Sequence, residues 1–248
     1  MVDDRDLMFP MDDTFFIRQI AARATGVGCD GIILLQPSEK ADIRMRFINP
    51  DGGEVEMCGN GARCLARLAH ELGAAEENLV IETNAGPVCA KVLDEQVTLE
   101  LTKPTGLQLD LDLGLSCATD FVNTGVPHVV AWADDVQAVD LIPLGRMIRY
   151  HERFAPQGTN ANFARVEGDG TITVRTYERG VEAETLACGT GAAAAAVLAA
   201  QRGWICLPVA VHCASGFDLV INSVAGKTTL SGNAVKVFEG ELEYGNRL

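Results

Sequence analysis

A Cys-Gly-x-Gly-Ala stretch that occurs twice is the feature that most constrains the fold of this 248-residue chain. The first copy spans residues 58–62 and the second spans residues 188–192. An alanine-rich helical pattern follows each copy and ends at a glycine the same distance beyond its cysteine, at Gly73 and at Gly203. A repeat offset of about 130 residues predicts two halves built on one plan, because a solenoid needs three or more short repeats.

Length and composition fit two soluble halves. Each half would hold about 120 residues, which is enough to bury a core. Hydrophobic residues make up 48% of the chain and charged residues 22%, as in ordinary globular proteins. The formal net charge of −14 argues against a nucleic acid or an anionic membrane as partner, because both repel an acidic surface. A small-molecule substrate remains compatible with this charge.

The chain is expected to be cytoplasmic, without a cofactor or a metal ion. Residues 2–6 are acidic where a secretory signal would be basic. The longest apolar run, residues 192–200, is far shorter than the roughly 20 residues of a membrane span. The eight cysteines are then expected to be reduced. They form no CxxC pair and the four histidines are scattered, so a zinc site is not predicted.

Each half is predicted to contain many short strands and one central helix. The segment 192–200 is small and apolar all round, which predicts a buried helix enclosed by a curved sheet. Capping and periodicity predict further helices from residue 15 to about 25 and over 144–150. The expected strands are 31–36, 43–48, 79–83, 87–92, 97–101, 118–123, 127–131, 160–166, 171–177, 209–212, 217–222, 227–230 and 234–238.

The two repeated cysteines are candidate catalytic residues. A cysteine at a helix N-terminus lies near the positive end of the dipole, where a thiolate is stabilised and the thiol pKa is expected to fall. The neighbouring glycines let a ligand approach the free N–H groups, which form an anion site. A single copy would more often be a buried structural cysteine. Two copies at equivalent positions favour a functional role.

One reaction class requires two such groups. If the halves face each other across a cleft, two sulfurs converge on one small acid. Inverting a stereocentre beside a carboxylate needs a base on one face of the carbon and an acid on the other. A thiolate and a thiol that titrate as a coupled pair meet this need in both directions. Two helix N-termini would stabilise the charge that develops on the carboxylate.

Ordered motifs along nearly the whole chain resemble the diaminopimelate epimerase family. They are Phe47-Ile48-Asn49-Pro50-Asp51-Gly52, Glu56-Met57-Cys58-Gly59-Asn60-Gly61-Ala62-Arg63-Cys64, Gly125-Val126-Pro127-His128, Gly158-Thr159-Asn160-Ala161-Asn162-Phe163, Tyr177-Glu178-Arg179-Gly180 and Ala187-Cys188-Gly189-Thr190-Gly191. The resemblance implies conversion of LL- to meso-diaminopimelate without pyridoxal phosphate, on the route to lysine and peptidoglycan.

The resemblance also implies a fold. It is an α/β (α+β) architecture of two pseudo-symmetric domains, each a barrel-like, mostly antiparallel sheet around a central helix. The active site lies in the cleft between the domains. We expect residues 1–105 and 236–248 to form the first domain and 106–235 the second, and we expect a homodimer.

Roles for individual residues follow from the resemblance. Cys58 and Cys188 would be the acid/base pair, with His128 assisting the first thiol and Glu178 the second. The substrate contacts would be backbone N–H groups of Gly59, Asn60, Gly189 and Thr190 at the reacting carboxylate, and Asn49, Asn160 and Arg179 at the distal end. Arg179 would grip the distal carboxylate bidentately and so discriminate against shorter amino acids.

Structural interpretations compete with several of these roles. His128 alone would be read as a hydrogen-bonded, half-buried histidine, and Glu178-Arg179 as a solvated turn pair. Arg63 and Arg67 are predicted to lie on a solvated helix face. The other cysteines (Cys29, Cys64, Cys89, Cys117, Cys206 and Cys213) are read as structural.

Two departures from the family pattern stand out. Val126 occupies a position where some members carry an asparagine that touches substrate. Family members also begin with a strand and a Lys-Met-His-Gly-x-Gly-Asn-Asp-Phe motif, which should just have ended where this chain starts. Loss of that strand would leave an unpaired sheet edge in the first half. We therefore expect a weakened or inactive enzyme that is prone to associate through this edge.

Other functions stay open on the sequence. A proline racemase has a histidine where Asn60 stands and an Asp-Arg-Ser-Pro stretch where residues 177–180 stand, which disfavours that alternative. A phenazine-type isomerase of the same fold would lack the cysteine pair. A non-catalytic amino-acid-binding protein on this fold is a second class. A Cys-His hydrolase is a third, although it would leave one cysteine idle.

Overall fold

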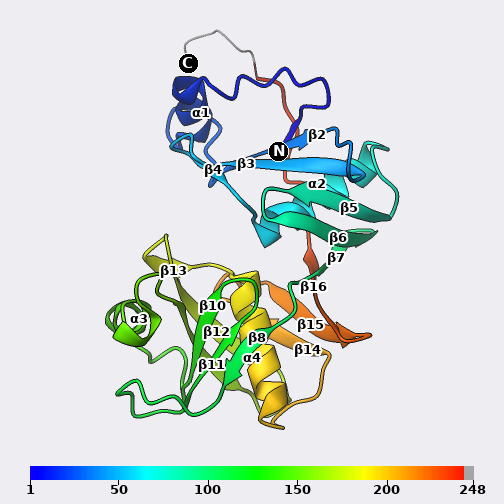
Figure 1. The fold of residues 1–248 in the computed structure, drawn as a ribbon. Coiled ribbons are helices and arrows are strands. Elements are labelled where there is room, and N and C mark those ends of the chain that lie inside the picture. The colour runs from blue at the N-terminus through cyan, green and yellow to red at the C-terminus, as the bar shows by residue number, and fades with distance from the viewer. Residues whose placement is uncertain (243–248) are drawn as a thin grey trace. The chain divides into compact units, whose positions relative to one another are not determined.

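The computed structural model describes residues 1–242 (Figure 1). The chain divides into two compact units, which are described separately below. The first comprises Met1–Leu99 together with the segment that begins at Asn233, and the second comprises Glu100–Gly232.

The first unit is built on a sheet with the strand order β1-β2-β3-β5-β6-β7, to which β4 adds beside β3. Most neighbours are antiparallel, but β1 runs parallel to β2 and β3 runs parallel to β5. The elements are β1 (Val2–Asp3), α1 (Thr14–Ala21), β2 (Ile32–Gln36), β3 (Ile43–Ile48), β4 (Glu54–Val55), α2 (Gly59–Glu71), β5 (Asn78–Thr83), β6 (Gly86–Leu93) and β7 (Gln96–Glu100).

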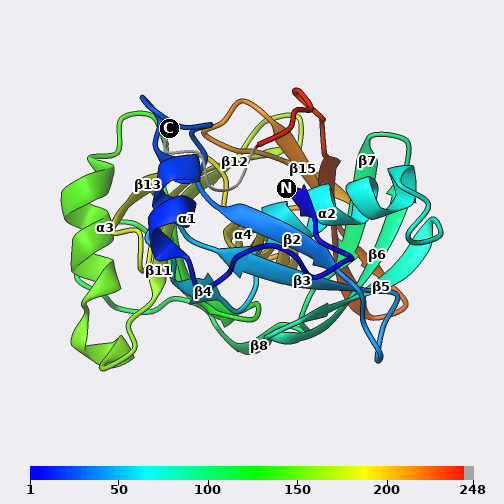
Figure 2. The same cartoon turned by 90° about the horizontal axis from the view of Figure 1, so that it is seen from above.

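Two helices cover opposite faces of β2. Successive side chains of a strand point to opposite faces, and here both faces are apolar. Ile32 and Leu34 pack with Phe16, Ile17 and Ile20 of α1, whereas Ile33 and Leu35 pack in the cluster that contains α2. All five residues of β2 are therefore buried. Figure 2 shows α1 at one end of β2 and β3.

The second unit has the strand order β16-β15-β14-β12-β11-β10-β9-β8, with β13 beside β12. The parallel neighbours are β10 with β11 and β12 with β14. The elements are β8 (Thr105–Gln108), β9 (Thr119–Asn123), β10 (Pro127–Trp132), α3 (Leu141–Arg149), a 3₁₀ turn (Glu152–Phe154), β11 (Asn160–Val166), β12 (Ile172–Glu178), β13 (Ala183–Thr185), α4 (Gly189–Gln201), β14 (Val209–His212), β15 (Asp218–Val224) and β16 (Lys227–Asn233).

The sheet of the second unit wraps around α4, as the sequence predicts. This helix contacts β9, β10, β11, β12, β14 and β15, and Ala192–Ala196 are fully buried. Alanine side chains let strands approach a helix from every side, which explains the absence of a polar face. Figure 1 shows α4 among these strands. No helix within residues 1–242 is long and apolar enough to cross a bilayer.

The two units share one order of elements. The series β1-α1-β2-β3-β4-α2-β5-β6-β7 in the first matches β10-α3-β11-β12-β13-α4-β14-β15-β16 in the second. Both series carry parallel pairs at the same two places. The duplication predicted from the cysteine repeat is therefore present in the topology.

Two expectations from the sequence are wrong. Residues 234–238 were expected to form a strand but have no regular secondary structure. They do return to the first unit, where Ala234 N donates to the carbonyl of Glu95 and Arg67 donates to the carbonyl of Ala234. Nor is β2 a bare edge, because Val2 and Asp3 pair with Leu34 and Leu35.

A buried carboxylate anchors the C-terminal end of α4. Asp120 is fully buried and accepts hydrogen bonds from Trp132 Nε1 at 2.7 Å and from Arg202 Nε and Nη2 at 2.6 Å each. Arg202 also binds Asp110, whose side chain is 72% exposed. The hydrogen bonds to Asp120 raise the pKa of the Arg202 guanidinium above its ordinary value.

Asp120→Asn is expected to lower the free energy of unfolding of the second unit by about 3 kcal/mol or more, because it removes the buried carboxylate that pairs with Arg202 and leaves only the exposed Asp110 as counter-charge. The matched control is Asp110→Asn, which should cost less than about 1 kcal/mol at its exposed position. Both tryptophans of the chain, Trp132 and Trp204, lie in the second unit, so urea titration followed by tryptophan fluorescence reports on it. Equal losses in the two variants would contradict this assignment.

Candidate active site

Cys58 is the N-cap of α2, as the repeat predicts. Its sulfur accepts a hydrogen bond from Gly61 N at 3.4 Å, and its carbonyl accepts one from Ala62 N. The side chain is half-buried. Because helix geometry leaves the first N–H groups without intrahelical acceptors, the backbone of Gly59 and Asn60 offers donors beside the sulfur.

The glycines of the two repeats have two different reasons to be glycine. A Cβ on Gly59 would meet nothing within 4 Å, which leaves room for the approach of a ligand. A Cβ on Gly61 would lie 2.5 Å from Ile33 Cδ1, and one on Gly191 would lie 2.4 Å from Asn162 Oδ1. A Cβ at the second glycine of each repeat would therefore crowd a side chain of a neighbouring strand.

Arg63 and Arg67 do not form a solvated helix face, which corrects the sequence prediction. Arg63 is 7% exposed and its Nη2 donates to Asn60 Oδ1 at 3.0 Å. Arg67 pairs with Glu71 and donates to the carbonyl of Ala234. The returning C-terminal segment contacts Arg67 and Glu71 of α2, and the local periodicity of the helix carries no signal of that segment.

Asn49 lies just beyond the end of β3, in a tight turn. Its N–H donates to the carbonyl of Gly53 at 2.8 Å, and its own carbonyl accepts from Gly52 N at 2.9 Å. Gly52 has a φ of +93°, a conformation that glycine adopts without strain. The turn leads through β4 to Cys58, so Asn49 and Cys58 belong to one short stretch of the first unit.

Cys188 is the N-cap of α4, the equivalent position in the second unit. Its sulfur is buried and lies 3.5 Å from Thr190 Oγ1. Burial, and next the negative charge of Glu178, raise the pKa of the Cys188 thiol to about 12. The expectation of a lowered thiol pKa at this helix end is therefore wrong for Cys188, because desolvation of the thiolate outweighs the helix dipole.

His128 is fully buried at the start of β10, and its ring faces the N-terminus of α4. Nε2 lies 2.9 Å from Thr190 Oγ1, and Nδ1 accepts a hydrogen bond from Asn162 Nδ2 at 3.1 Å. Burial, followed by the charge of Arg179, lowers the pKa of His128 to about 3. The imidazole is consequently neutral at physiological pH, and it is not the half-buried histidine of the structural alternative.

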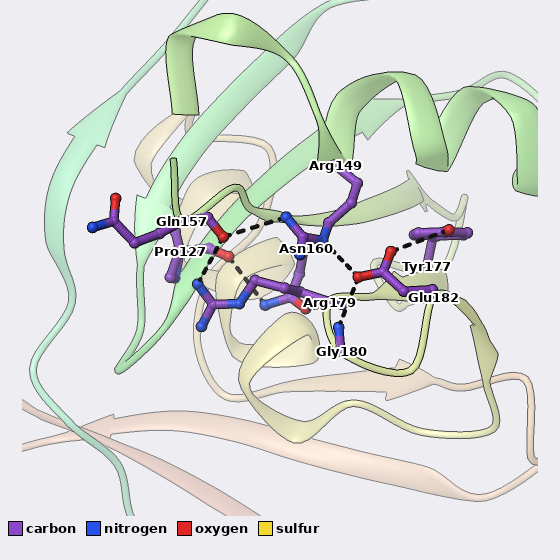
Figure 3. Close-up of polar contacts among 8 residues, drawn as sticks. All are labelled: Pro127, Arg149, Gln157, Asn160, Tyr177, Arg179, Gly180 and Glu182. Carbon is purple, nitrogen blue, oxygen red and sulfur yellow. Dashed lines mark hydrogen bonds and ion pairs between the residues drawn. The ribbon is translucent and has the colours of Figure 1, made fainter. Parts of the chain in front are cut away.

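Asn160 and Arg179 are brought together by the pairing of β11 and β12. Asn160 Oδ1 accepts from the backbone N–H of Arg179 at 2.8 Å, and Asn160 Nδ2 donates to the carbonyl of Pro127 at 3.1 Å. Arg179 Nη1 reaches the carbonyl of Gln157 at 3.5 Å (Figure 3). The buried side-chain amide of Asn160 thus fixes the backbone of Arg179. This bond distinguishes Arg179 from a residue of a fully solvated turn.

A second arginine, Arg149, lies near Arg179 and was not predicted from the sequence to belong to the site. Arg149 donates through Nε to Glu182 Oε1 at 3.0 Å, and the same oxygen accepts from Gly180 N at 3.1 Å (Figure 3). Glu182 adopts a φ of +58°, which is uncommon outside glycine. The pair fixes the turn that carries Arg179. No short motif signals it, because Arg149 and Glu182 meet only in the folded chain.

The structure therefore gathers the predicted residues into two groups. Cys58, Gly59, Asn60 and Asn49 lie in the first unit, and Cys188, Gly189, Thr190, His128, Glu178, Asn160 and Arg179 lie in the second. Of the cysteines read as structural, Cys213 is buried, Cys89 and Cys206 are exposed, and the other three are half-buried. Within residues 1–242, no cluster of three His, Cys, Asp or Glu side chains could hold a metal ion.

Solved structures define the class of fold. A phenazine biosynthesis protein of the PhzF family from Bacillus anthracis matches with a TM-score of 0.72, covering 97% of this chain and 91% of its own, at 17% identity. A probable proline racemase from Agrobacterium radiobacter K84 matches with a TM-score of 0.66, covering 91% and 79%, at 20% identity. This chain shares their two-unit fold.

Sequence relatives define the family within that class. The pattern of the family described as "Diaminopimelate epimerase" matches residues 1–106 and 121–237. Relatives called diaminopimelate epimerase are 45% identical in Aquifex aeolicus and 44% identical in Archaeoglobus fulgidus, each covering 92% of this chain and 85% of the relative. The chain belongs to the diaminopimelate epimerase family.

The lowered pKa of His128 predicts a pH-dependent loss of stability. An unfolded imidazole with a pKa near its ordinary 6.5 takes up a proton as the pH falls below that value, whereas the folded one does so only near 3. Uptake by the unfolded state destabilises the fold, so the contribution present above pH 6.5 is lost at about 1.4 kcal/mol per pH unit below it.

His128→Gln should remove this component. We expect its unfolding free energy to fall less steeply than that of the wild type between pH 6 and 5, by about 1.4 kcal/mol per unit. Urea titrations followed by tryptophan fluorescence measure both slopes. The slopes should agree above about pH 7.5, where the imidazole is neutral in both states. Equal slopes below pH 6 would show that folded His128 titrates as an ordinary histidine.

Proposed function

We propose that this protein is a diaminopimelate epimerase that inverts an α-carbon by acid/base catalysis with two thiols. The observation that carries the proposal is the pair of cysteines at equivalent N-cap positions of α2 and α4, in a chain of this family. Each unit supplies one thiol and one set of helix N-terminal donors. Such a pair suits a reaction that must add and remove a proton on opposite faces of one carbon.

The reacting carboxylate is proposed to bind the backbone N–H groups of Gly59, Asn60, Gly189 and Thr190. Removal of the α-proton places negative charge on this carboxylate, and N–H groups fixed at helix N-termini stabilise that charge without reorganising. The open space beside Gly59 supports the approach of a ligand to these donors. Because the chain supplies both the acid and the base, the mechanism calls on no cofactor.

Cys188 is proposed to begin the reaction as the proton donor. Its buried sulfur and the nearby charge of Glu178 favour the thiol over the thiolate. Cys58 would then remove the α-proton of the LL substrate, and the roles would exchange in the reverse direction. Glu178 would receive the Cys188 proton when that thiol must act as the base. Assistance of Cys58 by His128 stays a prediction, since both observed bonds of the imidazole are made within the second unit.

Arg179, Asn160 and Asn49 are proposed to recognise the distal amino-acid end of diaminopimelate. The turn held by Glu182 and Asn160 supports a fixed direction for the Arg179 guanidinium. A planar guanidinium can bind a carboxylate with two parallel hydrogen bonds. Shorter amino acids would leave the Arg179 guanidinium unpaired and would therefore bind weakly.

Two alternatives are separated by simple assays. A proline racemase would exchange the α-hydrogen of proline, which has no distal carboxylate for Arg179. A non-catalytic binding protein would bind diaminopimelate without exchanging any hydrogen. The homodimer and the cytoplasmic location stay predictions.

Cys58→Ser and Cys188→Ser are each expected to lose activity by about 10²- to 10⁴-fold, the usual contribution of a positioned general acid or base. A serine hydroxyl is a far weaker acid than a thiol, so it cannot form the required anion. The measurement is exchange of the α-hydrogen of LL-diaminopimelate with solvent deuterium.

The controls are Cys89→Ser and Cys206→Ser, at two exposed cysteines outside both groups. They should retain wild-type exchange. Full activity in either Cys58→Ser or Cys188→Ser would exclude the two-thiol mechanism. Exchange of proline but not of diaminopimelate by the wild type would favour the racemase alternative.

Arg179→Lys is expected to raise the KM for diaminopimelate by about 10- to 100-fold, the loss expected for a hydrogen bond to a charged group. The kcat should change much less, because the distal end takes no part in proton transfer. Arg165→Lys, at an exposed arginine of the same unit, is the matched control and should leave both constants unchanged. A fall in kcat with an unaltered KM would place Arg179 at the reacting end instead.

A further inference from the structure

A row of buried polar side chains leads from β12 to the sulfur of Cys188. It contains Thr176, Asn162 and His128, which are each at most 3% exposed. The sequence did not predict that these side chains form a row. Asn162 and Thr176 are direct partners in the β11–β12 pair. The row continues through Thr190, in the first turn of α4. Buried polar groups of this kind must be hydrogen-bonded, so the direction of each bond can be worked out.

The orientation of the Asn162 amide is fixed by a backbone carbonyl. Nδ2 lies 2.8 Å from the carbonyl oxygen of Val129, which can only accept, so the atom at this position must be the NH₂ group. Oδ1 consequently faces Thr176 Oγ1 at 2.9 Å and accepts its hydroxyl proton. The second hydrogen of Nδ2 points at His128 Nδ1, 3.1 Å away.

The amide in turn fixes the tautomer of His128. Because Nδ1 accepts from Asn162, it carries no proton, and a neutral imidazole then has its proton on Nε2. Nε2–H donates to Thr190 Oγ1 at 2.9 Å. The pKa of His128, lowered to about 3 by burial, agrees with a ring that holds one proton throughout the physiological range.

The hydroxyl of Thr190 can donate a hydrogen bond to the sulfur of Cys188. Its oxygen accepts from His128, which leaves the hydroxyl proton free to point at Cys188 Sγ, 3.5 Å away. When Cys188 carries its proton, either atom can donate. When Cys188 is a thiolate, only Thr190 can, and a hydroxyl that already accepts a hydrogen bond is a stronger donor.

The packing around Asn162 is built for this arrangement. A Cβ at Gly191 would lie 2.4 Å from Asn162 Oδ1, so only glycine lets the amide reach its place beneath the first turn of α4. Thr190 is also tied down at its backbone, where its carbonyl accepts from Thr124 Oγ1 at 2.9 Å. The row therefore connects three strands of the sheet to the N-terminus of the helix.

We propose that Asn162 is a positioning residue that sets the tautomer of His128, so that hydrogen-bond donation runs from Thr176 through Asn162, His128 and Thr190 to the Cys188 thiolate. This role rests on the proposed function, in which Cys188 alternates between thiol and thiolate. The relay stabilises the thiolate inside a site whose burial and neighbouring carboxylate disfavour it. Asn162 acts through His128 and Thr190 and does not touch the reacting atoms.

The first test reads the tautomer directly in the wild-type protein. Two-bond ¹H–¹⁵N correlation spectra of ¹⁵N-histidine-labelled protein distinguish protonated from unprotonated ring nitrogens, and His128→Gln identifies the His128 signals. We expect a protonated Nε2 and an unprotonated Nδ1 from pH 5 to pH 9. A proton on Nδ1 at neutral pH would overturn the relay, because Asn162 could then not donate to it.

The second test reads the donor at the sulfur. Alkylation of Cys188 by iodoacetamide at pH 8, followed by peptide mass spectrometry, is proportional to the thiolate fraction. Thr190→Val and Asn162→Leu are each expected to slow it by about tenfold, the effect of losing one hydrogen bond to a charged group. Thr190→Ser keeps the hydroxyl and should keep the wild-type rate.

The double variant separates a relay from two independent effects. Residues that act in one chain are not additive, so Thr190→Val with Asn162→Leu should be no slower than either single variant. Two separate contributions would multiply to about 100-fold. Alkylation of Cys58 in the other unit is the internal control and should be unchanged in every variant. An unchanged Cys188 rate in Thr190→Val would overturn the proposal even if Asn162→Leu failed to fold.

Neither test uses substrate, so a result that contradicts the relay can be distinguished from one that contradicts the proposed function. Normal Cys188 alkylation in all variants with intact exchange on diaminopimelate would remove the relay and leave the epimerase. Slowed alkylation in a protein that exchanges no hydrogen of diaminopimelate would remove the epimerase and leave the relay.

Discussion

The burial of α4 on all sides is the constraint on which the second unit depends. A helix without a polar face cannot lie at a surface, so the sheet must close around it, and alanine is the residue that permits this closeness. Closure puts the N-terminus of the helix against the strand ends that carry His128, Asn162 and Glu178. The catalytic candidate and its polar neighbours are therefore assembled by the same packing that buries the core.

Much of this arrangement is local enough to be predicted from the sequence. The cysteine repeat predicted both N-cap positions, and the apolar pattern of residues 192–200 predicted an enclosed helix. The strands predicted over 43–48, 160–166 and 209–212 have the observed bounds of β3, β11 and β14. What the sequence missed depends on distant segments. The contact that covers Arg67 comes from the C-terminal segment. Arg149 meets Glu182 only when β12 and α3 have packed together.

The pKa of Cys188 shows how two local rules can oppose each other. The helix terminus stabilises a thiolate, and a sequence motif reports the helix terminus. Burial destabilises a thiolate, and no motif reports how deeply a sulfur is enclosed. The outcome is a thiol whose anion needs specific partners, and the relay through Thr190 is a means of supplying one. The close packing at the second glycine of each repeat is likewise not signalled by a motif, because the neighbouring side chain lies on a strand far away in the sequence.

The anchor at Arg202 has a mechanical consequence for the helix. Arg202 caps the C-terminal end of α4 and is held by a fully buried carboxylate, while Thr190 is tied at the opposite end. With both ends fastened, α4 cannot slide along its own axis without breaking a buried ion pair. The sulfur of Cys188, at the N-terminus of α4, therefore keeps a fixed position in the second unit. Any adjustment of distance during a proton transfer has to be made by the molecule that approaches it.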